Sequence, residues 1–146
     1  MSQAGVCDDA AGSASTIACF AYPKNKFKEK PMFSAAAFFV AEVLEATQQA
    51  CLAGSQRWLI LSLETTKINA VTFRLFRISD SWTSGGQTGD IYRVFHNKKC
   101  YEVGLQEAYT SSGAYEPGTI KEFTKQDQDE VHGRLKQALD SFRFLK

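Results

Sequence analysis

The sequence is poor in the residues that build metal centres. It has only two histidines among 146 residues, and its four cysteines form no C-x-x-C pair. A structural zinc site needs clustered cysteine and histidine ligands at such spacings. We therefore expect this chain to bind neither a metal ion nor a cofactor.

Long apolar runs and a strong net charge are also missing. No run approaches the roughly 18–20 apolar residues of a membrane span, and the formal net charge is only +1. These features predict no membrane span and no general attraction to nucleic acid. The first residues contain neither the basic segment nor the apolar core of a signal peptide. We expect an exported form to have lost its leader already.

The four cysteines, Cys7, Cys19, Cys51 and Cys100, leave two interpretations open. They are buried thiols of a cytoplasmic protein, or they form two disulfides in an exported one. An even count fits disulfides without requiring them.

One domain is the simplest organisation for a chain of this length. Residues 1–15 are rich in Gly, Ala, Ser and Asp without periodicity, which predicts an irregular lead-in. A β-like run over residues 16–22 then opens a single α+β domain that spans residues 16–146.

The strongest strand signal predicts a β-hairpin over residues 90–105, with Asn97 and Lys98 in its turn. Strand side chains alternate between the two faces of a sheet. This register therefore groups apolar side chains on one face: Tyr92, Val94, Tyr101, Val103 and Leu105. Arg93 and Glu102 meet on the other face as an opposite-charge pair. A register slip of one residue would lose both features.

Two more strands are expected before the hairpin, over residues 57–63 and 69–79, joined at residues 64–67. The first is apolar on both faces, which predicts a central strand covered on both sides. The Gly-rich stretch 80–89 lacks a phosphate-binding motif and is expected to be a flexible connection that carries Trp82.

Residues 34–54 are ambiguous. Helix propensity favours one helix, with Ser34 as its N-cap and Gly54 just past its end. The alternative is a buried strand around residues 38–43, followed by a shorter helix over residues 45–52.

The clearest helix spans residues 124–140 at the C-terminal end of the domain. Thr124 is the expected N-cap, and Asp127 stands where a capping box needs an acceptor. An apolar stripe predicts an amphipathic helix that covers the sheet: Val131, Leu135, Ala138 and Leu139.

The chain ends with Leu139-Asp-Ser-Phe-Arg-Phe-Leu145, which resembles the closing L-x-S-F-[KR]-F of the PsbP-like family. Residues 69–73, 92–102 and 117–120 look like an uncharacterised group of bacterial exported or envelope proteins with the same ending. Together, residues 69–146 carry this likeness.

The resemblance implies an antiparallel sheet sandwiched between helices, an α/β/α arrangement. It also implies a protein exported to the periplasm or cell envelope, with a cytoplasmic location as the alternative. In that setting Cys51 pairs with Cys100, and Cys7 pairs with Cys19. The family offers no common catalytic set to transfer onto this sequence.

We assign no catalytic residue. His96 and Cys100 have the spacing of a base and a nucleophile, but the hairpin register directs them to opposite faces. We favour a non-enzymatic accessory or protein-interaction domain. The candidate surface is aromatic: Trp82, Tyr92, Tyr101, Tyr109 and Tyr115. The alternatives are a carrier of a small apolar ligand and an enzyme with a dispersed site that uses Asp80, His96 or Glu102.

Overall fold

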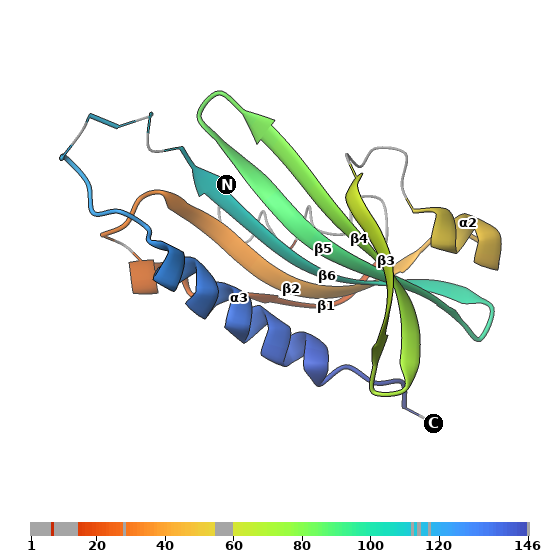
Figure 1. Cartoon of the computed structure of the whole chain (residues 1–146). Helices are drawn as coiled ribbons and strands as arrows, with labels where there is room; N and C mark the ends of the chain where they lie inside the picture. Colours follow the sequence, from red (N-terminus) through yellow and green to blue (C-terminus); the bar gives the residue numbers. More distant parts are fainter. Residues whose placement is uncertain are drawn as a thin grey trace.

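The computed structural model describes Cys7 and residues 15–27, 29–54, 60–111, 113, 115–116 and 118–145. Apart from Cys7 and Ser15, the expected lead-in lies outside these residues. The strands are β1 (Ser15–Ala21), β2 (Phe33–Val43), β3 (Ile60–Ile68), β4 (Val71–Trp82), β5 (Gly85–His96) and β6 (Lys99–Thr110). The helical elements are the 3-10 turn η1 (Lys24–Phe27), α2 (Gln48–Ala53) and α3 (Lys125–Asp140), as labelled in Figure 1 where space allows.

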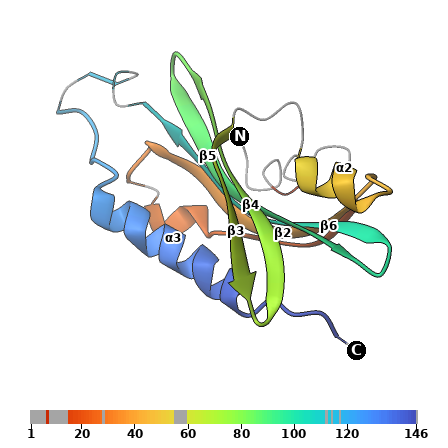
Figure 2. The ribbon, with the colours of Figure 1, turned by 45° about the vertical axis from the view of Figure 1, so that its right-hand side comes forward.

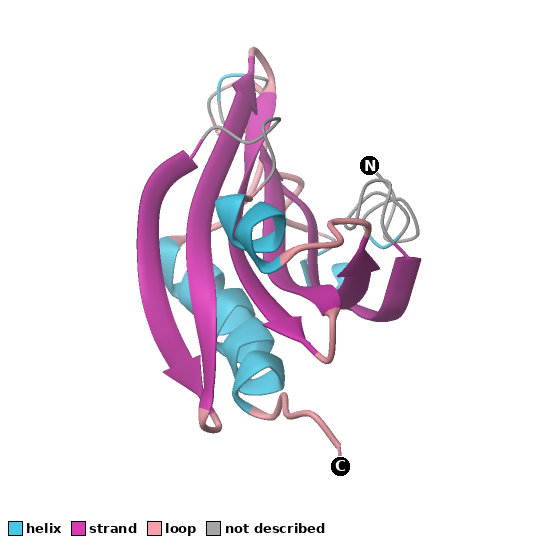
Figure 3. Cartoon of the chain, turned by 90° about the vertical axis from the view of Figure 1, so that its right-hand side faces the viewer, coloured by secondary structure: helices cyan, strands magenta, loops and turns pink. Residues whose placement is uncertain are grey.

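The strands form one sheet in the order β1-β2-β6-β5-β4-β3, and every pairing is antiparallel. Figure 3 shows α2 in front of the strands and α3 behind them. The predicted α+β class with an antiparallel sheet is therefore confirmed. Among the described residues, no helix has the length and apolar character that a membrane crossing needs.

The hairpin of β5 and β6 has the predicted register. Asn97 and Lys98 form its turn with φ of 49° and 64°, and Arg93 lies opposite Glu102. Positive φ at both positions gives the turn a twist that matches the twist of the strands. The apolar side chains predicted for one face belong to, or pack against, a single core cluster: Tyr92, Val94, Tyr101, Val103 and Leu105.

Helix α3 covers that face of the sheet, as Figure 2 shows. Val131, Leu135 and Leu139 are its buried residues, and all three belong to the same core cluster. The expected capping box is present: the Thr124 side chain accepts from the Asp127 amide, and the Asp127 carboxylate accepts from the Thr124 amide. These bonds satisfy two backbone donors at the start of the helix.

The prediction of one helix over residues 34–54 was wrong. The segment forms strand β2 and then the short helix α2, which is the alternative arrangement with a longer strand. The alanines that favour a helix instead let β2 lie between β1 and β6 with both faces buried. Tertiary pairing has overridden local propensity here.

Among the described strands, β3 lies at an edge of the sheet and pairs with β4 alone, so its predicted central position was also wrong. Its Leu63 side chain is 47% exposed; residues 57–59 lie outside the described part of the chain. The connection is the tight turn Asn69–Ala70, with φ of 48° and 67°, rather than residues 64–67. The β-branched Thr65 and Thr66 continue the strand.

The expected loop over residues 80–89 is mostly strand. β4 continues to Trp82, β5 begins at Gly85, and only Thr83 and Ser84 form the turn between them. Glycine is required where the neighbouring strand lies very close. At Gly85, for example, a Cβ would lie 2.2 Å from the Tyr109 carbonyl oxygen. The same residues that suggested flexibility therefore permit close strand contact.

Gly104 of β6 provides a test of this packing. A Cβ at this position would lie 2.2 Å from the buried Phe39 ring, so we expect Gly104→Ala to lower the free energy of unfolding by about 1–3 kcal/mol. The control is Gly133→Ala on the exposed side of α3, where a Cβ meets nothing within 4 Å. That change should stabilise by about 0.5–1 kcal/mol. Urea unfolding of both variants measures the difference, and equal effects would contradict the packing argument.

Candidate binding site

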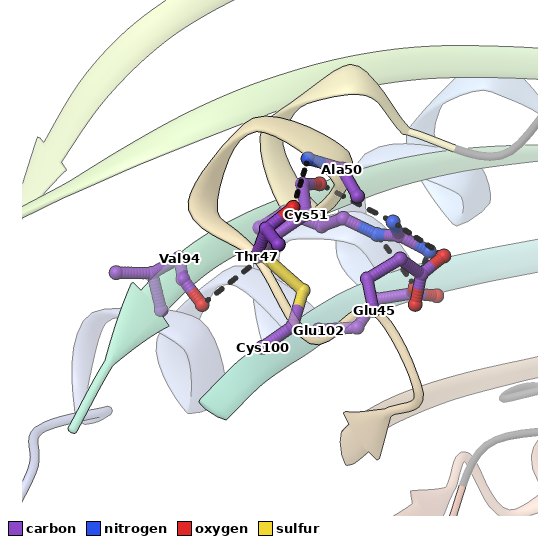
Figure 4. Close-up of a disulfide and its surroundings, with 8 residues drawn as sticks. Glu45, Thr47, Ala50, Cys51, Val94, Cys100 and Glu102 are labelled. Atoms are coloured by element: carbon purple, nitrogen blue, oxygen red, sulfur yellow. Dashed lines mark hydrogen bonds and ion pairs between the residues drawn. A yellow bond between two sulfur atoms is a disulfide. The ribbon is translucent and has the colours of Figure 1, made fainter. Parts of the chain in front are cut away.

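On the side of the sheet that carries α2, a buried ion pair and a disulfide join three elements (Figure 4). The Arg93 guanidinium donates to Glu102 Oε2 from Nε at 3.0 Å and from Nη2 at 2.9 Å. Its Nη1 donates to Glu45 Oε1 and to the Cys51 carbonyl, both at 3.2 Å. The Cys51–Cys100 disulfide ties α2 to β6 beside this network. The buried charges are therefore paired within a structural cluster.

The structure has the two disulfides that the resemblance implied. Cys51 and Cys100 are joined with a Cα–Cα distance of 5.6 Å, and Cys7 and Cys19 with one of 5.7 Å. Disulfides persist in oxidising compartments and are rare in the cytosol. The pair of bridges therefore fits an oxidising environment.

The residues considered for catalysis do not come together. His96 stacks on Phe144 at a centroid distance of 3.8 Å, on the α3 side, whereas Cys100 is buried in its disulfide on the other. Glu102 is paired with Arg93 on that second side, and Asp80 is exposed near the end of β4. Within the described residues, no group of three His, Cys, Asp or Glu side chains could hold a metal ion.

The five aromatic residues proposed as an interaction surface are dispersed. Tyr92 is buried in the core, and Tyr101 packs against Phe144 at 5.3 Å. Trp82 and Tyr109 are exposed, but strand alternation places them on opposite faces of the sheet. The Tyr115 hydroxyl donates to the Pro31 carbonyl oxygen at 3.2 Å.

Between the first turns of α3 and the sheet lies a cavity of about 390 Å³, here called the Glu107 pocket. Most of its lining is apolar or aromatic, with a few polar groups among it. The lining residues are Phe33, Thr88, Glu107, Ala108, Tyr109, Phe123, Gln128 and Val131. This size and lining are typical of sites for small ligands.

Glu107 is the one carboxylate among the lining residues of the pocket. Its Oε1 is buried and accepts no hydrogen bond from any described residue. His132 Nδ1 lies 3.7 Å away, within ion-pair reach but too far for a hydrogen bond. Burial raises the pKa of Glu107 above its ordinary value, and the charge of Asp90 adds to this, while His132 opposes it.

Sequence analysis missed Glu107, although the sequence contains a signal for it. The hairpin register places Val103 and Leu105 on the inner face, and continuing the alternation along β6 puts Glu107 there too. A carboxylate at an inward position is uncommon and marks a candidate site. The expected hairpin ended at residue 105, so this position was not considered.

The raised pKa of Glu107 predicts a pH-dependent stability. The folded protein binds this proton more tightly than the unfolded chain, so stability falls as pH rises from about 4.5 through the raised pKa. Glu107→Gln should therefore be more stable than the wild type at neutral pH, and the difference should vanish below pH 4.5. Thermal unfolding between pH 4 and 8 measures it, with the exposed Glu122→Gln as control. A Glu107→Gln variant less stable at neutral pH would contradict the prediction.

Comparison with known proteins adds information on the fold alone. No protein-family model matches this chain, and no curated protein matches it in sequence. The structure is similar to the crystal structure of PA94 from Pseudomonas aeruginosa, a protein of unknown function, with a TM-score of 0.57 and 11% identity. The match covers 94% of this chain and 88% of PA94. The two chains thus have similar folds over nearly their whole lengths.

Proposed function

We propose that this chain is a non-enzymatic binding domain whose Glu107 pocket receives a small ligand with an apolar body. The observation that carries the proposal is the 390 Å³ cavity beneath α3, with aromatic walls and few polar groups. Apolar walls supply affinity, and isolated polar groups set the orientation of the ligand. The dispersed positions of Asp80, His96 and Glu102 favour binding over catalysis.

A role in protein interaction has less support. Tyr92 is buried, Tyr101 is half-buried, and the exposed Trp82 and Tyr109 lie on opposite faces of the sheet. These side chains cannot form one continuous aromatic surface. The small-ligand carrier, an alternative at the level of sequence, is therefore the better-supported function.

A fluorescent apolar probe, N-phenyl-1-naphthylamine, tests the binding proposal. We expect a saturable rise in emission with one site per chain. Gln128→Trp places a bulky ring at the pocket and should weaken the probe's binding by about tenfold or more, a loss of about 1.4 kcal/mol. The matched control is Gln137→Trp, an exposed position of α3 outside the pocket lining. Absence of saturable binding, or equal binding by both variants, would count against the proposal.

We further propose that the protein is exported, to the periplasm or cell envelope, and is a PsbP-like domain. Two disulfides support export. An antiparallel sheet with α2 on one side and α3 on the other supports the likeness.

Thiol titration of the protein from its native cells tests the export proposal. Unfolded without reductant, the chain should expose no thiol; after reduction it should expose four, one for each cysteine. Alkylation during lysis prevents oxidation in the extract. Four free thiols in the freshly trapped protein would refute the export proposal.

A further inference from the structure

The Glu107 pocket contains an acceptor that lacks a matched donor. Glu107 Oε1 is shielded from water, and the described residues give it no hydrogen bond. The Glu107 side chain lines the cavity and is 29% exposed, so a molecule bound there lies next to it. A buried acceptor left without a donor is costly, and a positive charge beside the carboxylate lowers that cost.

Among the described residues, two cations on the α3 side of the sheet already have carboxylate partners. Arg77 pairs with Glu64 at 3.2 Å and with Asp90 at 3.8 Å. On the α3 side, Lys30 Nζ lies 2.6 Å from Asp127. His132 Nδ1 lies 3.7 Å from Glu107 Oε1, and its side chain is 47% exposed, so water weakens the interaction between them.

The balance of charge around Glu107 therefore favours a cation. Asp90 occupies the same face of the neighbouring strand, with its partner Leu105 two residues before Glu107. Its charge acts on Glu107 in the unfavourable direction, as that of a second carboxylate must. An added positive charge beside Glu107 would offset this repulsion.

The remaining walls also suit an organic cation. The rings of Phe33, Tyr109 and Phe123 line the cavity, and the centroids of Phe33 and Phe123 are 5.2 Å apart. Aromatic faces attract ammonium groups, most strongly where water is excluded. The same rings bury the apolar part of a ligand.

We infer that the Glu107 pocket selects ligands that carry an ammonium group on an apolar body, with the Glu107 carboxylate as the counter-ion; this inference rests on the proposed binding function. Thr88 and Gln128 supply further oxygen acceptors for ammonium hydrogens. A charge-assisted hydrogen bond in a partly buried site is about twice as strong as a neutral one, so the selectivity comes from the head group.

Displacement of N-phenyl-1-naphthylamine by three matched compounds tests the inference: 4-phenylbutylamine, 4-phenylbutanol and 4-phenylbutyrate. At neutral pH we expect the amine to displace the probe about tenfold more strongly than the alcohol, and the acid to be the weakest. In Glu107→Gln the ratio of amine to alcohol should fall to about one. In Glu122→Gln, an exposed position outside the pocket lining, the ratio should stay as in the wild type.

The outcomes separate the two proposals. If the probe binds but the amine and alcohol are equal, or the acid is strongest, the ammonium inference is wrong and the binding function stands. A preference for the amine that persists in Glu107→Gln also overturns it. If neither the probe nor any of the three compounds binds, both proposals fail. Circular dichroism of Glu107→Gln confirms that the variant is folded before its ratio is interpreted.

Discussion

The pairing of β5 with β6 determines what each face of the sheet contains. Because Arg93 lies opposite Glu102, every second residue along both strands is assigned to one side. One side receives Tyr92 and Val103 and is covered by α3. The other receives the buried ion pair and Cys100. A shift of one strand by one residue would place Arg93 and Glu102 on opposite faces of the sheet and separate the ion pair.

The two faces are completed in different ways. On the α2 side, polar groups are satisfied within the protein: Arg93 bonds to two carboxylates and a carbonyl, and the disulfide holds the helix in place. On the α3 side, apolar side chains fill the space between the sheet and most of the helix. Near the first turns of the helix they leave a cavity, which Glu107 lines. The polar groups around Arg93 all have hydrogen-bond partners, as is typical of a structural cluster. Within the described part of the chain, the Glu107 carboxylate has an oxygen without a donor, which is more typical of a binding site.

Much of the fold could be predicted where local signals agree with tertiary packing. The Asn97–Lys98 turn, the hairpin register and the Thr124 capping box each depend on nearby residues, and each is confirmed. β2 was misassigned because its alanines favour a helix, while its strand form depends on two distant partners. The edge position of β3 likewise depends on the order of the strands in the sheet. The apolar periodicity of a single strand carries no information about that order.

The candidate site was harder to predict than the fold. Its residues come from β2, β5, β6 and α3 and from the segment before α3, so no short motif contains them. Alternation along β6 was sufficient to place Glu107 on the inner face. The cavity itself arises from how the first turns of α3 meet the sheet, and such a gap has no signature in a single sequence.

Strand order also bears on how the chain assembles. Strands β3, β4, β5 and β6 follow one another in the sheet as they do in the sequence, joined by two-residue turns. β2, in contrast, is separated from β6 in the sequence by the other three strands of the meander, although the two strands are neighbours in the sheet. Val43, for example, pairs with Cys100. Loop-closure entropy makes the short turns cheaper to form than this distant contact. Within this sheet, the pairing of β2 with β6 is therefore the most costly to close, and the pairings of the meander are the cheapest.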